Sequence, residues 1–167
     1  MSINNRIDAP YDELEIGNIF RTSGRTITES DVVNFCMLTG NWLEIHSNAH
    51  YASKTRFGAR LVQGSLVYAI IPGLIQFGPV VQANYGLDNL RYLKPVHIGD
   101  TIYVVAEVVR KKEKDAKYGV VTLLMKALNQ HGEIVQRSEF SLLFLRRRAD
   151  LEELLAATMP SLQASGA

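Results

Sequence analysis

The sequence predicts an α+β fold in which one apolar helix lies against an antiparallel β-sheet. The longest apolar stretch, residues 60–77, has the length of a helix. The second half of the chain instead holds four segments rich in Val, Ile, Thr, Tyr and Phe, which are typical of strands: 80–92, 101–109, 118–127 and 134–145. An apolar helix must be covered by other structure, so we expect it to lie on the concave face of this sheet.

The breaks between the four expected strands contain residues that favour turns. They are Lys94-Pro95 with Ile98-Gly99-Asp100, then 111–117, then Asn129-Gln130-His131-Gly132. Consecutive strands with short links favour antiparallel pairing.

Shorter elements are expected on either side of the helix and the sheet. Residues 16–27 are β-prone and predict a strand or hairpin edge. Thr28 and Asp31 resemble a capping box, which predicts a helix that ends at Gly40. A further short helix over 50–54 has Ser47 or Asn48 as its cap, and residues 149–157 predict another, followed by a frayed SLQASGA end.

Within the long apolar segment, Pro72-Gly73 is expected to kink or end the helix, because proline lacks a backbone N–H and clashes with the preceding turn.

Length and charge restrict the possible functions. The 167 residues fit one domain, 1–167, or one protomer whose core a partner completes. With 18 basic and 17 acidic residues the net charge is +1, so neither nucleic acid nor an anionic membrane is favoured as a partner. The apolar run 66–75 is too short to span a bilayer, and the N-terminus has no apolar segment of the secretory kind. Cys36 is the single cysteine, which favours a reducing compartment, and we expect a cytoplasmic protein.

The most informative segment runs from Thr39 to Leu66. It reads TGNWLEIH over 39–46, then Tyr51-Ala52, Arg56-Phe57-Gly58 and LVQGSL over 61–66. This ordered set resembles the MaoC-like (R)-specific hydratase/dehydratase family, whose signature is S/T-G-D-x-N-P-x-H, then Y/F-A, F-G and I/V-x-G-x-L. The motifs cover about residues 27–66, and the later strand order agrees with the hotdog fold of that family.

The resemblance implies an enzyme that adds water to a trans-2-enoyl thioester, giving the (R)-3-hydroxyacyl product, or that runs the dehydration. It implies a catalytic pair made by a carboxylate at position 41 and His46, at the mouth of an acyl tunnel. Backbone N–H groups of Gly64 and Ser65, at the start of the central helix, would hold the thioester oxyanion. The substrate would be carried by coenzyme A or an acyl carrier protein, without a further cofactor, and the protein would be a homodimer joined edge to edge.

The sequence departs from the family pattern at the catalytic carboxylate. Position 41 is Asn, whose amide can orient a water molecule but cannot accept its proton; Leu43 and Glu44 replace the usual Asn and Pro. Three interpretations stay open. Asn41 is an engineered change from Asp that traps substrate, or Glu44 supplies the carboxylate from an extended segment that also carries His46, or the protein handles another thioester reaction or only binds its ligand.

Two rival functions therefore accompany the hydratase. One is a noncatalytic module that binds acyl-CoA or an acyl carrier protein. The other is a thioesterase, which in the hotdog fold depends on a carboxylate elsewhere.

Several further side chains are candidates for contacts with the ligand. Trp42 and Tyr51 either line the acyl tunnel or simply pack. Cations that could meet the phosphates of coenzyme A are Lys54, Arg56, Arg91, Lys94 and Arg146-Arg147-Arg148. His46 and His50 have the spacing of a helical metal pair, but Cys36, His97 and His131 do not cluster with them, so we expect no metal.

Overall fold

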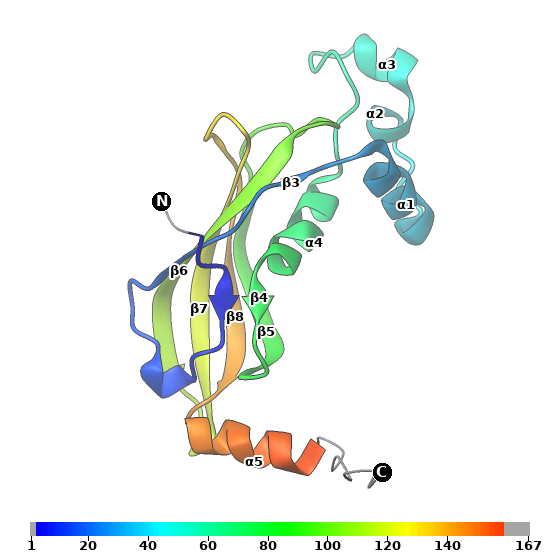
Figure 1. The fold of residues 1–167 in the computed structure, drawn as a ribbon. Coiled ribbons are helices and arrows are strands. Elements are labelled where there is room, and N and C mark those ends of the chain that lie inside the picture. The colour runs from blue at the N-terminus through cyan, green and yellow to red at the C-terminus, as the bar shows by residue number, and fades with distance from the viewer. Residues whose placement is uncertain (1–2, 159–167) are drawn as a thin grey trace, which may run out of the picture.

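The structure is a computed structural model that describes residues 3–158. Its centre is a six-stranded sheet with the order β2-β6-β7-β8-β5, in which β3 also pairs with β6 (Figure 1). The bounds are β2 Ile19–Arg21, β3 Arg25–Thr26, β5 Val81–Tyr92, β6 Thr101–Glu113, β7 Tyr118–Leu128 and β8 Ile134–Leu145. All of these pairings are antiparallel, which confirms the four predicted long strands and the edge expected between 16 and 27.

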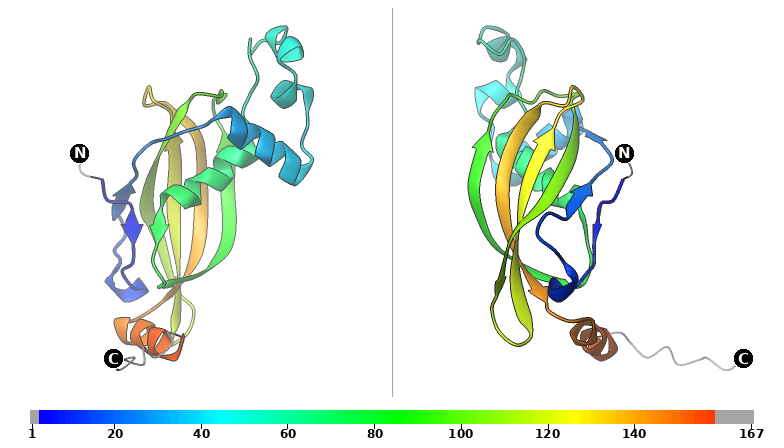
Figure 2. Two further views of the ribbon diagram at one scale, coloured as in Figure 1. Left: turned by 45° about the vertical axis from the view of Figure 1, so that its right-hand side comes forward. Right: turned by 90° about the vertical axis from the view of Figure 1, so that its left-hand side faces the viewer.

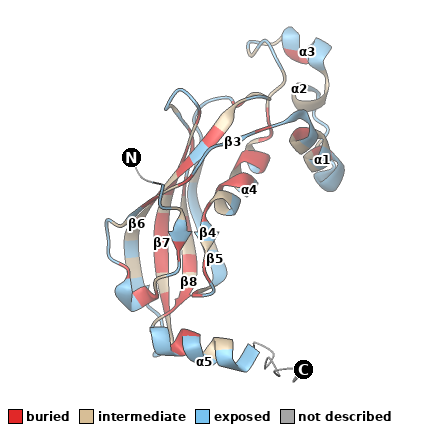
Figure 3. Ribbon diagram, in the orientation of Figure 1, coloured by how far each residue is buried: buried red, intermediate tan, exposed pale blue. Residues whose placement is uncertain are grey.

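The sheet curves around helix α4, Gly64–Leu74 (Figure 2). Alternate residues of β7 and β8 point toward this helix and are buried; Leu123 lies opposite Phe140, and Phe140 stacks on Tyr68 of α4 with 5.4 Å between ring centroids. Figure 3 shows this buried layer along β7, β8 and α4. The apolar helix is therefore covered by the concave face of the sheet, as predicted.

The predicted bounds of this helix, 60–77, are wrong at both ends. Residues before Gly64 are held in an extended path, because Leu61 forms a β-bridge with His97 and the Val62 N–H donates to the Val96 carbonyl. After Leu74 the chain enters β4, Gln76–Phe77, which pairs in parallel with β1, Arg6–Ile7. Pro72 lies inside the helix, which ends two residues later. Long-range backbone pairing decides both ends.

Helix α1, Glu29–Thr39, has the predicted signals at both of its ends. The Thr28 hydroxyl accepts from the Asp31 N–H while the Asp31 carboxylate accepts from the Thr28 N–H, and Gly40 ends the helix with φ +70°. Burial acts to raise the pKa of Asp31, but the hydrogen bonds from Thr28 and the charge of Arg25 outweigh it, so the pKa lies below its usual value. The Asp31 carboxylate of the capping box therefore stays ionised at neutral pH.

Two short helices follow α1. They are α2, Glu44–Ser47, and α3, Ala49–Ser53, which begins one residue before the predicted helix and is capped by Asn48, one of the two caps that the sequence offered. In Figure 1, α1 lies to one side of the sheet near one end, and the chain continues past that end to α3. A 3-10 turn, Tyr11–Glu13, and helix α5, Arg148–Thr158, lie at the opposite end of the sheet, and α5 matches the helix predicted there. The SLQASGA end lies outside the described residues. None of the helices between residues 3 and 158 is both long and apolar enough to cross a membrane.

Candidate active site

A cavity of about 500 Å³ opens where α4 begins, between the segment after α3 and the end of β5. Its walls come from His46 and three stretches of chain: Arg56, Phe57, Leu61, Val62, Gly64, Ser65 and Val67; Tyr92, Leu93, Lys94, Pro95 and Val96; and Val135 and Gln136. Most of these side chains are apolar. The volume suits a small organic group, because ligand sites are usually concave, mostly apolar spaces of this size with a few polar groups.

His46 is held in the cavity wall by a backbone acceptor. Its ring Nδ1 lies 2.8 Å from the Leu61 carbonyl oxygen, and the Leu61 N–H donates to the Ile45 carbonyl at 3.0 Å. A carbonyl oxygen only accepts, so Nδ1 carries the proton and Nε2 of the neutral ring keeps its lone pair. The imidazole is therefore oriented with a free acceptor, as a general base requires.

The start of α4 supplies hydrogen-bond donors to the same cavity. The Gln63 carbonyl accepts from the N–H groups of Leu66 and Val67, and no side chain caps the helix. Within residues 3–158 the N–H groups of Gly64 and Ser65 have no hydrogen-bond partner. Free N–H groups at a helix N-terminus favour a negatively charged or carbonyl oxygen.

Tyr92, at the end of β5, closes over Gly64. A Cβ atom at position 64 would lie 2.6 Å from the Tyr92 ring, so only glycine permits this approach. Burial, and secondarily the neighbouring Tyr68, raise the pKa of Tyr92 above its usual value, so its hydroxyl keeps its proton at neutral pH. Tyr92 was not among the residues predicted from the sequence, because its contact with Gly64 joins positions 28 residues apart.

The structure brings His46, Gly64 and Ser65 together, but not the other predicted site residues. Asn41, Trp42 and Glu44 do not line the cavity, and Trp42 is half exposed. Asn41 follows the Gly40 turn, where its N–H donates to the Thr39 hydroxyl. Tyr51 is also about half exposed and outside the cavity wall.

The geometric argument for Glu44 is wrong. Glu44 and His46 lie in helix α2, not in an extended segment. Residues two apart on a helix project roughly 200° from each other. The Glu44 carboxylate instead accepts a hydrogen bond from the Asn48 side chain. No carboxylate at all is found among the described residues that line the cavity.

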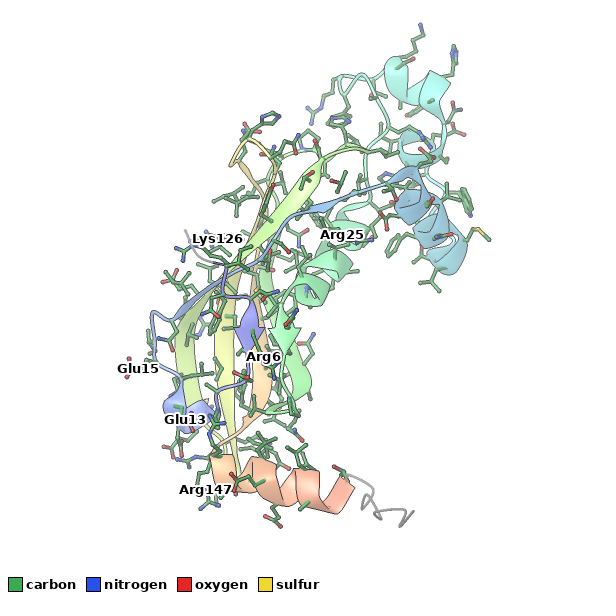
Figure 4. The ribbon with its side chains drawn as sticks, in the orientation of Figure 1. Arg6, Glu13, Glu15, Arg25, Lys126 and Arg147 are labelled. Carbon is green, nitrogen blue, oxygen red and sulfur yellow. The ribbon has the colours of Figure 1, made fainter. Side chains whose placement is uncertain are left out.

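Of the candidate cations, Arg56 and Lys94 line the cavity, whereas Lys54 and Arg91 do not. The Arg56 guanidinium lies 4.9 Å from the centroid of the Phe57 ring, and Lys94 pairs with Glu133. Arg147 lies beside α5 at the opposite end of the sheet, and Arg146 and Arg148 pair with acidic residues there (Figure 4). Of the cations that the sequence left as open candidates, Arg56 and Lys94 therefore lie at the cavity, and the arginine triplet lies away from it.

His50 lies on α3, exposed and outside the cavity. In the part of the chain that the structure describes, no three His, Cys, Asp or Glu side chains gather as a metal ion would need.

Comparison with known proteins identifies the family. Residues 13–129 match the model of the MaoC-like domain. Protein MaoC of Klebsiella aerogenes is 39% identical over 106 residues, which are 62% of this chain and 32% of that protein. The 3-hydroxybutyryl-CoA dehydratase of Methylorubrum extorquens is 33% identical over 99 residues, 59% of this chain and 62% of that one. The chain thus spans about a third of the length of Protein MaoC and somewhat under two thirds of the length of the 3-hydroxybutyryl-CoA dehydratase.

Solved structures agree with the sequence matches. The unliganded R-hydratase PhaJ1 of Pseudomonas aeruginosa is 31% identical, with a TM-score of 0.69 over 83% of this chain and 86% of that one. The double-hotdog protein RV0216 of Mycobacterium tuberculosis, at 21% identity, has a TM-score of 0.76 over 84% of this chain and 45% of that one, which shows the hotdog fold. This chain has that fold and belongs to the MaoC-like dehydratase family.

Proposed function

We propose that this protein hydrates a trans-2-enoyl thioester to the (R)-3-hydroxyacyl thioester, or catalyses the reverse dehydration. One observation carries the proposal: an oriented histidine and two free helix N–H groups share one cavity. The dehydratase and hydratase names of its relatives support the reaction class. Arg56 and Lys94 in the wall favour a phosphate-bearing carrier such as coenzyme A. We also propose a cytoplasmic location, which the free thiol of Cys36 would suit.

His46 would serve as base and then as acid. Its Nε2 takes a proton from water as the water oxygen bonds to C3 of the substrate, and the electron pair of the double bond moves toward the thioester carbonyl. The imidazolium then returns a proton to C2, which completes the addition of water. The hydrogen bond to the Leu61 carbonyl holds the ring in place through both protonation states.

The N–H groups of Gly64 and Ser65 would stabilise the enolate oxygen that forms in between. Donors fixed by a helix backbone need no reorganisation during the reaction, and one such donor is typically worth roughly 10²–10³-fold in rate. From the family motif we also assign Asn41 the role of orienting water through its amide without accepting a proton. Asn41 lies outside the cavity wall, so this role requires the loop before α2 to approach His46 when substrate binds.

The direct test is hydration of crotonyl-CoA by the unmodified protein. The reaction is monitored through the loss of enone absorbance. Measurable turnover that yields the (R)-3-hydroxy product is expected. Glu44→Gln serves as a matched variant, because Glu44 bonds Asn48 away from the cavity, and its rate should equal that of the unmodified protein. Absence of turnover with every enoyl thioester tried would refute the hydratase.

Gly64→Ala should lower kcat for the same reaction by about 10–100-fold. The new methyl group displaces the Tyr92 ring into the cavity, and misplacement of a reacting group by ~1 Å can cost about 10²-fold. Gly64→Ala should lower kcat less in the Tyr92→Ala background than in the unmodified protein, because the clash with the Tyr92 ring is then absent. An equal loss in both backgrounds would show that Tyr92 is not the cause.

A noncatalytic acyl-thioester binding module is the second candidate. It is favoured by the absence of any carboxylate among the described residues of the cavity wall. The same observation counts against a thioesterase at this site. Binding of acyl-CoA without turnover of enoyl-CoA would support the module.

We propose in addition a homodimer formed through β5. This strand is at the edge of the sheet, all of its residues are exposed or half-buried, and a long unprotected edge invites pairing with another strand. Apolar side chains also stay exposed on the segment from α1 to α3, among them Met37, Leu38, Trp42 and Leu43. A second copy would cover such surface.

Leu87→Asp on β5 should weaken this dimer at least tenfold, because the substitution places a charge on the pairing edge. Sedimentation velocity over a range of concentrations measures the effect. Ile134→Asp on β8 is the control, since Ile134 and Leu87 are both 36% exposed but β8 lies between β7 and β5. Equal dissociation of both variants, or a monomeric unmodified protein, would contradict the β5 interface.

A further inference from the structure

The cavity has one wall residue that does not fit a purely apolar acyl chain. Gln136 of β8 lines it, is 1% exposed, and neither its amide nitrogen nor its amide oxygen has a hydrogen-bond partner among the described residues. Buried polar groups are nearly always paired, so an unpaired glutamine is a reason to look for a ligand. The next residue on the same face, Ser138, is fully buried and also has an unpaired hydroxyl.

The register of the sheet places this amide beside the proposed reaction centre. Gln136 of β8 pairs with Tyr92 of the neighbouring strand β5, and the Tyr92 ring covers Gly64. Paired residues on neighbouring strands project to the same face. That face is the concave one, because Phe140, four residues along β8, stacks on Tyr68 of α4. A ligand held at Gly64 would therefore extend toward Gln136.

The neighbours of Gln136 and Ser138 on this face are apolar. On the neighbouring strand β7, Ala127 lies opposite Gln136 and Met125 lies opposite Ser138; both β7 residues are fully buried. The cations of the wall, Arg56 and Lys94, are exposed instead. The inner wall is thus neutral: the Gln136 amide can both donate and accept a hydrogen bond, but among the described residues no positive charge is present there for a carboxylate.

We propose that the preferred substrate is a thioester whose acyl chain carries a neutral hydrogen-bonding oxygen, a hydroxyl or carbonyl, which Gln136 binds. The inference rests on the acyl-thioester ligand of the proposed function but not on its turnover. A site built to bond a substrate oxygen discriminates against an analogue that has a methyl group instead, because the buried amide is then left unpaired.

Binding is the first test, and it uses saturated thioesters that cannot be hydrated. Calorimetry compares 4-hydroxybutanoyl-, 5-hydroxypentanoyl- and 6-hydroxyhexanoyl-CoA with pentanoyl-, hexanoyl- and heptanoyl-CoA, each pair differing by a terminal hydroxyl in place of a methyl. In at least one pair the hydroxyl compound should bind about tenfold tighter or more. Gln136→Met, of similar size, should reverse that preference, whereas Gln82→Met, an exposed glutamine outside the cavity wall, should leave it unchanged.

Stability of the free protein is the second test and needs no ligand. Replacing an unpaired buried amide by an apolar side chain of the same size should raise Tm of Gln136→Met by about 2–4 °C. A lowered Tm would show that the amide is satisfied within the protein, and would overturn the proposal, as would tighter or equal binding of the methyl compound in all three pairs. If the protein turns over crotonyl-CoA but binds the hydroxyl and methyl compounds equally well, the hydratase is retained and the polar substrate is rejected. If it prefers the hydroxyl compound but does not turn over crotonyl-CoA, the polar ligand is retained and the hydratase is rejected.

Discussion

Substitution of His46 by Ala should lower kcat for crotonyl-CoA hydration by about 10²–10⁴-fold, the usual range for general acid–base assistance. No carboxylate lines the described cavity wall, so no carboxylate beside His46 can take over proton transfer. The variant should keep its fold, since His46 is only half-buried and its side chain hydrogen-bonds to the Leu61 carbonyl alone among the described residues. Initial rates at saturating substrate, with circular dichroism to check folding, give the comparison.

The control for His46→Ala is His50→Ala. Both residues are histidines on neighbouring short helices, but His50 is exposed and outside the cavity. Its rate should stay within about twofold of the unmodified protein, because surface substitutions rarely perturb a structure. A His46→Ala variant with full activity would show that the imidazole plays no part in the reaction.

Asn41→Asp should raise kcat by about 10²-fold or more. The family motif has Asp at this position, and a carboxylate can accept the proton of water where an amide can only orient it. The substitution changes little in size, and within residues 3–158 the Asn41 side chain makes no hydrogen bond that the change would break. The same absorbance assay measures the gain.

Asn34→Asp is the matched control for Asn41→Asp, because it introduces the same charge on an exposed position of α1. Its rate should not change. If Asn41→Asp is no faster than the unmodified protein, position 41 does not reach the reacting water, in line with its place outside the cavity wall.

The site was predictable where it depends on local sequence. The capping box of Thr28, the Gly40 stop and the Asn48 cap are contacts within a few residues, so the pattern predicted α1 and α3 well. His46, Gly64 and Ser65 were named from a motif, and the structure places them in one cavity. The geometric argument for Glu44 was wrong, because the sequence pattern does not reveal that residues 44–47 form a helical turn.

Other features depend on contacts between distant segments. The bounds of α4 follow from the pairing of residues 61 and 62 with 96 and 97, and from β1 meeting β4. The approach of Tyr92 to Gly64, and the position of Gln136 beside it, follow from the register of β5 and β8. No local propensity encodes such distances.

By itself the sequence determined the α+β class, the order of its elements, the family and the residue types available for chemistry, because apolar periodicity, turn residues and motif spacing are local properties. Only the tertiary structure decided which of those residues share a cavity and which polar groups are buried without a partner. Those outcomes depend on strand register and on the angle at which the helix meets the sheet, which the whole chain sets together.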